Sequence, residues 1–277
     1  MIRIYANRYY WLVSEIIGER GIIFLLKYTL AIYVDMVMRV LYQVYSYAYS
    51  ILFNAPLVYV IGDSHSWAFK NQRSFIIRNI GPATAYNLVN RNSTIQSYRK
   101  LFEAVEKIDR KKDYVILTFG EIDCRVHFYN QYMKNNGKVS MDKLMDTTIE
   151  NYGQVLRELG TRGVNFLIYG VLPAARDVVR YPPYATKKIR EEVVNSFKSS
   201  YHYQASPEMR SYINRRFNEK LKAYCMAHQY KYLDIYPVVA DKQGFVRDEF
   251  VADEIHVNGR IMPYVKEMLK KECNLRP

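Results

Sequence analysis

Hydrophobic and polar positions divide the chain into two parts with different patterns. Residues 22–53 are rich in Leu, Ile, Val and Tyr, and the charges Lys27, Asp35 and Arg39 lie on one face at helical spacing. This pattern predicts one apolar helix. Its longest uncharged run, Val40 to Phe53, is shorter than the roughly 18 residues that a membrane-spanning helix needs. Such a helix must bury its surface by packing on the domain or a second subunit, by lying in the membrane interface, or by spanning.

After Pro56 the pattern changes to short apolar runs that alternate with amphipathic segments. The runs predict strands at 57–61, 75–80, 114–119, 164–169 and 230–236. The amphipathic segments predict helices at 95–108, with Ser93-Thr94 as a cap, and at 141–159, 207–228 and 260–271. This alternation is typical of a flavodoxin-like, three-layer α/β/α fold with a central parallel sheet of about five strands. We therefore expect an apolar helical segment at 1–54 and an α/β domain at 55–277.

Three short polar segments stand where an α/β sheet builds its sites. Residues 62–65 (Gly-Asp-Ser-His) follow the first predicted strand, and residues 120–125 (Gly-Glu-Ile-Asp-Cys-Arg) follow the third. Residues 253–256 (Asp-Glu-Ile-His) come just before the last predicted helix. Because ligands bind beyond the carboxyl ends of parallel strands, these segments are candidates for one shared site.

The residue types in these segments fit nucleophilic catalysis. A serine hydroxyl is a poor nucleophile and needs an adjacent base. Ser64 would lie at a strand-to-helix turn, where backbone N–H groups can receive negative charge. Asp253 can accept from one ring nitrogen of His256 while the other ring nitrogen accepts the serine proton. The alternatives are a simple helix-capping turn and an exposed loop pair.

Together these segments resemble the SGNH hydrolases, also called the GDSL-type esterases, over roughly Pro56 to the C-terminus. The apolar helical part lies outside the resemblance. The resemblance implies that Ser64 is the nucleophile and that His256 and Asp253 complete a catalytic triad. It also implies an oxyanion hole formed by the backbone N–H groups of Ser64 and Gly81.

The third block of that family normally reads Gly-x-Asn-Asp, and its Asn supplies another oxyanion donor. Here Ile122 occupies the position of the Asn and cannot donate. We expect Arg125 to replace it, since a guanidinium can donate to an oxyanion. The alternative is that Arg125 only pairs with Glu121 or Asp123. The side chains that we expect to contact substrate are Asp63, His65, Glu121, Asp123 and Arg125.

The resemblance implies ester chemistry without a metal or a required cofactor. We expect the substrate to be an O-acyl group, above all O-acetyl, of carbohydrate in glycan or polysaccharide modification. The acyl group would pass to water, or to a sugar hydroxyl with acetyl-CoA as one acyl donor. One alternative is a membrane-associated lipid esterase. Another is a non-catalytic module that binds glycan in the same cleft, which the missing block-three Asn keeps open.

Composition extends these expectations to partners and location. The net charge of +13 favours anionic partners, but no nucleic-acid-binding signature accompanies it, so we expect no nucleic acid partner. Three widely spaced cysteines favour a reducing compartment, and no signal-peptide pattern is present. We expect a cytoplasmic protein. If the apolar helix binds lipid, we expect the protein at the inner face of the membrane; if the helix instead packs on a second copy, we expect a homo-oligomer.

Residues 176–206 combine tyrosines with basic residues. They predict either a loop that stacks on sugar rings or a solvated insertion.

Overall fold

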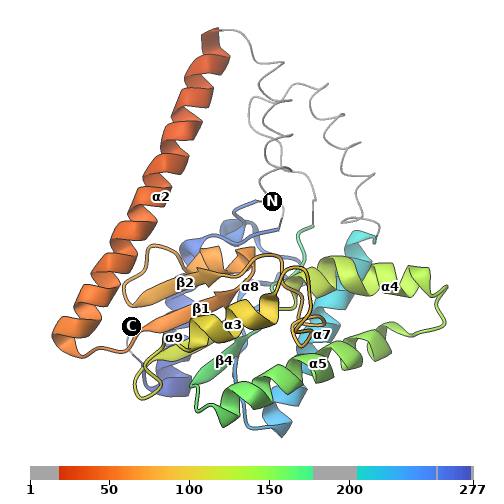
Figure 1. Cartoon of the computed structure of the whole chain (residues 1–277). Coiled ribbons are helices and arrows are strands. Elements are labelled where there is room, and N and C mark those ends of the chain that lie inside the picture. The colour runs from red at the N-terminus through yellow and green to blue at the C-terminus, as the bar shows by residue number, and fades with distance from the viewer. Residues whose placement is uncertain (1–18, 177–204, 254, 276–277) are drawn as a thin grey trace.

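A parallel sheet forms the centre of the computed structural model, which describes residues 19–176, 205–253 and 255–275 (Figure 1). The sheet has five strands in the order β2-β1-β3-β4-β5. The strands are β1 (Val58–Gly62), β2 (Phe75–Asn79), β3 (Tyr114–Thr118), β4 (Phe166–Tyr169) and β5 (Lys231–Leu233). All neighbouring strands pair in parallel. The predicted sheet is confirmed, and every strand begins inside its predicted run.

Helices cover both faces of this sheet, which confirms the predicted three-layer α/β/α fold (Figure 1). Among the described residues, the helices of the domain are α3 (Ser97–Val105), α4 (Phe128–Lys134), α5 (Met141–Thr161), α7 (Pro207–Ala227), α8 (Tyr236–Val239) and α9 (Met262–Cys273). Shorter turns are η1 (Ser64–Phe69), η2 (Asp123–His127), η4 (Asp248–Phe250) and η5 (Gly259–Ile261).

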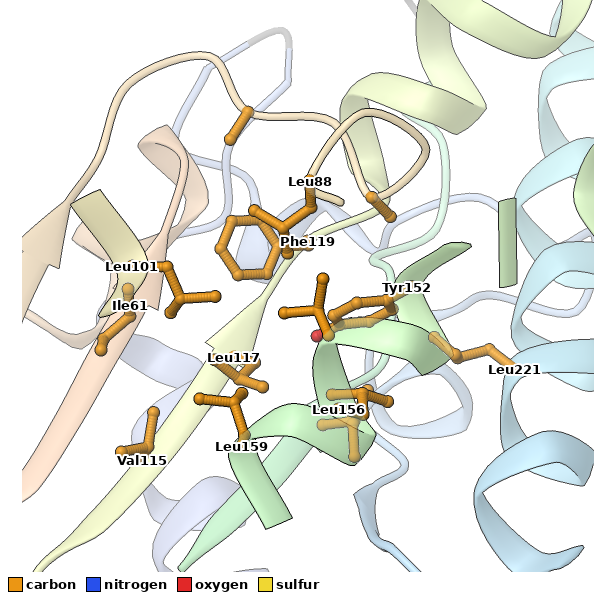
Figure 2. Close-up of a cluster of buried hydrophobic side chains, with 14 of the residues drawn as sticks. Ile61, Leu88, Leu101, Val115, Leu117, Phe119, Tyr152, Leu156, Leu159 and Leu221 are labelled. Atoms are coloured by element: carbon orange, nitrogen blue, oxygen red, sulfur yellow. The ribbon is translucent and has the colours of Figure 1, made fainter. Parts of the chain in front are cut away.

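Each face of the sheet has its own hydrophobic core. Because successive strand residues point to opposite faces, β1 sends Ile61 into one core and Val60 into the other. The first core receives side chains from α3, α5 and α7, and Figure 2 shows part of it around Leu117 and Tyr152. The second core receives side chains from η1, α8 and α9. This double burial explains why the strands are apolar at nearly every position.

The helix starts follow from local chemistry. At the start of α7, Ser206 Oγ accepts from the backbone N–H of Met209, and Pro207 occupies the first turn, where its missing N–H is not needed. The predicted Ser93-Thr94 cap of α3 is wrong. Instead Gln96, with a left-handed backbone and no side-chain cap, directly precedes this helix. Only the residue next to the first turn can reach its free N–H groups, so a cap predicted too early does not form.

The apolar segment before the domain is helical, as predicted. Helix α2 (Glu19–Phe53) has 35 residues and stands along the edge of the sheet that ends in β2 (Figure 1). Within the described parts of the chain, no helix combines the length and apolar character needed to cross a bilayer. The boundary predicted at residues 54 and 55 falls between the end of α2 and the start of β1.

Candidate active site

Ser64 begins η1, directly beyond the carboxyl end of β1. Asp63 caps this turn, since its carboxylate accepts from the backbone N–H of His65 at 2.8 Å. The preceding Gly62 has no room for a side chain, because an added Cβ would lie 2.0 Å from Thr118 Oγ1 on the neighbouring strand β3. The close pairing of β1 with β3 therefore requires glycine immediately before the serine turn.

His256 connects Ser64 to Asp253 through both of its ring nitrogens. Its Nε2 lies 2.8 Å from Ser64 Oγ, although the two residues are 192 positions apart in the sequence. Its Nδ1 lies 2.9 and 2.8 Å from the two carboxylate oxygens of Asp253. A carboxylate at Nδ1 holds the proton on that nitrogen and leaves Nε2 to accept from a hydroxyl. The structure thus brings these three side chains together in one hydrogen-bonded chain.

The turn at residues 253–256 is built around the Asp253 carboxylate. Its Oδ1 also accepts from the backbone N–H groups of Ile255 at 2.9 Å and His256 at 2.8 Å. Burial by itself would raise the pKa of Asp253, but the hydrogen bond and charge of His256, together with these N–H donors, lower it to about 2. Asp253 is therefore ionised at neutral pH, which is the state that can orient an imidazole.

His65 joins the serine turn to the histidine turn. Its ring is buried, with Nδ1 2.9 Å from Asp63 Oδ1 and Nε2 2.9 Å from the backbone carbonyl oxygen of Ile255. Both partners are acceptors, so both ring nitrogens donate and the ring carries a positive charge. Burial would lower the pKa of His65, but the negative charges of Glu121 and Asp63 raise it to about 9. A buried imidazolium thus fastens the loop that carries His256, and the two histidine rings lie 4.8 Å apart.

Glu121 and Arg125 form an ion pair just beyond β3. Arg125 Nε donates to Glu121 Oε1 at 2.7 Å, and Glu121 Oε2 lies 3.8 Å from His65 Nε2. Burial would raise the pKa of Glu121, but the charges of Arg125 and His65 lower it. The structure therefore shows the pairing that was the alternative to a direct oxyanion role for Arg125.

Asp123 is fully buried and fastens a second loop. Its Oδ2 accepts from the N–H of Ala85 at 2.6 Å, and its Oδ1 accepts from the N–H of Tyr86 at 3.0 Å. Burial raises the pKa of Asp123 to about 7, although these backbone donors favour the ionised form. Asp63, His65 and Asp123 are all buried and hydrogen-bond to other protein groups, so the structure shows them supporting loops, and their contact with substrate stays a prediction.

The loop after β2 carries Gly81, the expected oxyanion donor. Its backbone is left-handed, with φ at +96°, a conformation that favours glycine. Its N–H donates to Asn79 Oδ1 at 3.0 Å, so an oxyanion at this N–H would have to share or displace that bond. Asn79 Nδ2 is buried and has no acceptor among the residues that the structure describes. Sequence reasoning missed Asn79, whose place at the end of a strand beside β1 was the available signal.

The comparison with known families agrees with this geometry. The model of the family described as GDSL-like Lipase/Acylhydrolase matches residues 58–265. The chain belongs to this family. The predicted family is thereby confirmed, and membership implies a hydrolase of the serine esterase class, which typically needs no cofactor.

Several solved structures are similar to this GDSL-like hydrolase. A GDSL-like lipase from Bacteroides thetaiotaomicron VPI-5482 is 17% identical with a TM-score of 0.47, over 83% of this chain and 95% of that one. An extracellular lipase from Streptomyces rimosus is 11% identical with a TM-score of 0.42, over 79% and 100% of the two chains. A catalytic mutant of an acetylxylan esterase from Geobacillus stearothermophilus is 10% identical with a TM-score of 0.40, over 79% and 94%. No curated protein matches the chain. Similarity at this level carries no argument about substrate.

One cluster of this GDSL-like hydrolase has the residue types of a metal site. Asp63, His65 and Glu121 place ligand atoms within 4.8 Å of one another. However, both nitrogens of His65 already face acceptors, and the positive charges of His65 and Arg125 balance the two carboxylates. The cluster is therefore charge-paired by its own side chains, and the expectation that the enzyme needs no metal stays a prediction. Most of the tyrosine-rich and basic segment at 176–206 lies outside the described residues.

Proposed function

We propose that the chain is a serine esterase that acts on O-acyl groups, and above all on O-acetyl groups of carbohydrate. One observation carries this proposal. In a member of an acylhydrolase family, Asp253, His256 and Ser64 form a continuous chain of hydrogen bonds at the carboxyl edge of the sheet. In this assignment Ser64 is the nucleophile, His256 is the general base, and Asp253 orients the imidazole and stabilises its cation.

The first half-reaction forms an acyl-enzyme. Ser64 Oγ attacks the ester carbonyl carbon while its proton passes to His256 Nε2 over the 2.8 Å hydrogen bond. The tetrahedral intermediate collapses by breaking the bond to the sugar oxygen, which takes the proton back from His256 and leaves as a hydroxyl. During this step Asp253 stays ionised and faces the imidazolium.

The second half-reaction decides between hydrolysis and transfer. Water attacks the acyl-enzyme with His256 as base, and the products are a carboxylic acid and free Ser64. If a sugar hydroxyl attacks instead, the same steps produce a new ester, with acetyl-CoA as a candidate donor of the first acyl group. The two outcomes differ only in which hydroxyl reaches the acyl-enzyme.

The oxyanion that forms in both halves needs hydrogen-bond donors. The Ser64 and Gly81 N–H groups are the donors that the family resemblance implies. We assign the third donor to Asn79, because its buried Nδ2 has no acceptor in the described chain and its Oδ1 contacts Gly81. This arrangement would make up for Ile122, which has no donor to offer.

The net charge of the protein supports the proposed substrate class, and one other substrate class is a second candidate. A net charge of +13 supports an anionic partner, such as an acidic glycan or the phosphates of acetyl-CoA. A lipid esterase is the second candidate, and the exposed apolar residues of α2 favour it. The two candidates share the same serine chemistry and differ in the acyl chain and the leaving alcohol.

Hydrolysis of p-nitrophenyl acetate tests the reaction type, and Ser64→Ala is the decisive variant. We expect this variant to lower kcat by at least about 10³-fold. Ser93→Ala is the matched control, because Ser93 is a buried serine whose Oγ has no partner among the described residues. Equal activity of wild type and Ser64→Ala, or failure of a fluorophosphonate to label wild type, would favour a non-catalytic binding module.

A second measurement separates the substrate classes. The wild-type enzyme is incubated with O-acetylated oligosaccharides and, in parallel, with phospholipid, and released acetate and fatty acid are measured. We expect acetate release, and acyl transfer when a sugar acceptor is added. Release of fatty acid alone would replace the carbohydrate substrate with a lipid.

A further inference from the structure

Helix α2 docks on the domain through its polar side. Asp35 accepts from Lys70 Nζ at 2.7 Å, and the guanidinium of Arg39 lies 4.6 Å above the ring of Trp67. Two turns beyond Arg39, Ser46 Oγ accepts from the backbone N–H of Ser74 at 3.1 Å. These α2 residues follow one another at spacings of four and seven, so they share one face of the helix. The helix therefore uses its few polar side chains to bind the domain.

The opposite side of α2 is apolar and exposed. Its large hydrophobic side chains range in exposure from 38% at Met38 to 79% at Ile51. We call the following set the outward face: Leu30, Tyr33, Val34, Met36, Val37, Met38, Val40, Leu41, Val44, Tyr45, Ile51 and Leu52. At 3.6 residues per turn, this set covers roughly 200° of the helix circumference. Between residues 29 and 53 the charged residues are Asp35 and Arg39, and both lie on the docked side.

The width of the outward face indicates what covers it. A single partner helix buries a stripe of about 100°, so a second copy of α2 would leave roughly half of this face in water. A helix that lies in a membrane interface buries about half of its circumference, which matches the outward face far better. The exposed tyrosines Tyr33 and Tyr45 have the amphipathic rings that suit the headgroup region.

Charge next to α2 complements an anionic lipid surface. Arg73 lies 4.7 Å above the ring of Tyr49, and Lys112 Nζ donates to Ser50 Oγ at 3.3 Å. With a net charge of +13, the protein as a whole is attracted to anionic headgroups.

We propose that the outward face of α2 lies in the headgroup and upper acyl region of an anionic lipid bilayer and holds the enzyme at the membrane surface. The attachment is close to the reaction centre. Trp67 belongs to η1 and Lys70 directly follows it, and both residues contact α2. The same η1 begins with Ser64. In Figure 1 the N-terminal half of α2 reaches past the edge of the sheet. The enzyme would thus meet acyl esters that are presented at a lipid surface.

Vesicle binding by the full chain tests this proposal without any substrate, so its result is independent of the esterase assignment. The probes are vesicles of phosphatidylcholine and phosphatidylglycerol in a roughly 7:3 ratio, measured by co-sedimentation. We expect wild type to bind, and binding to weaken several-fold when salt rises from about 0.1 to about 0.5 M. The variant Val37→Glu/Leu41→Glu/Val44→Glu places three carboxylates at the centre of the outward face and should lower the apparent affinity at least about tenfold.

The matched control adds the same charge elsewhere. Met133→Glu/Tyr212→Glu/Met226→Glu replaces three exposed apolar residues of the domain and should retain vesicle binding within about threefold. Circular dichroism checks that both triple variants are folded. Leu41→Trp is a milder variant, and its fluorescence should shift to shorter wavelength when vesicles are added.

Three results would overturn the proposal. They are no binding of wild type to these vesicles, equal binding by the α2 triple variant, and a Leu41→Trp fluorescence that vesicles leave unchanged. A wild-type dimer in lipid-free solution that the α2 triple variant dissociates, without vesicle binding by wild type, would show that a second copy covers this face instead.

Discussion

Replacing His65 with Gln tests whether a buried imidazolium holds the loop of His256. The rise of the His65 pKa from 6.5 to about 9 on folding corresponds to about 3 kcal/mol of stability from the charged form. The folded-state pKa is the higher one, so this stability is complete below pH 6.5 and is lost as the pH rises through 9. Gln can replace one of the two donors but carries no charge.

The assay is urea unfolding of both proteins at about pH 6 and about pH 9.5. The difference in unfolding free energy between wild type and His65→Gln should be largest near pH 6. Between the two His65 pKa values it should shrink by up to about 1.4 kcal/mol per pH unit. Asp123, whose pKa is about 7, titrates in the same window, but its contribution is common to both proteins and cancels in the difference.

A difference that is equal at both pH values would show that His65 is neutral in the folded protein, and the reasoning would fail. Activity supplies a second readout. Because His65 acts through the backbone carbonyl of Ile255, His65→Gln should lower kcat by roughly 10- to 100-fold and leave KM nearly unchanged. A rise in KM with unchanged kcat would instead place His65 in substrate binding.

Four single substitutions supply the remaining predictions. Asp253→Asn should lower kcat on p-nitrophenyl acetate by about 10³- to 10⁴-fold at neutral pH, because an amide does not hold the imidazole in the required tautomer; a loss below tenfold would contradict this role. Asn79→Ala should lower kcat by about 10²-fold with little change in KM, and unchanged turnover would remove it from the oxyanion hole. Gly62→Ala should cost about 3 kcal/mol or more in urea unfolding, because its Cβ would lie 2.0 Å from Thr118 Oγ1. In contrast Gly160→Ala, with no atom within 4 Å of the added Cβ, should be neutral or stabilising.

The sequence alone predicted the features that depend on near neighbours. The strands could be predicted from the sequence because buried parallel strands are apolar at nearly every position and several end at glycine. The pairing of Asp253 with His256 could also be predicted, because two residues three positions apart on one turn can contact each other independently of the tertiary structure. The resemblance to a known family then pointed to Ser64 and to the position of the missing Asn. These inferences use spacings of a few residues.

Only the tertiary structure decided which groups meet across long separations. His65 finds its second acceptor 190 positions away at Ile255, and Asp123 finds its donors on the loop after β2. Polar residues at a strand end look alike in sequence whether they face substrate or protein, so the burial of Asp123 and the pairing of Arg125 could not be read in advance. The same holds for α2. Its apolar composition predicted that another surface buries it, but did not indicate which side of the helix packs on the domain. Strand order and packing set these contacts, because they depend on the position of the whole backbone and not on local spacing.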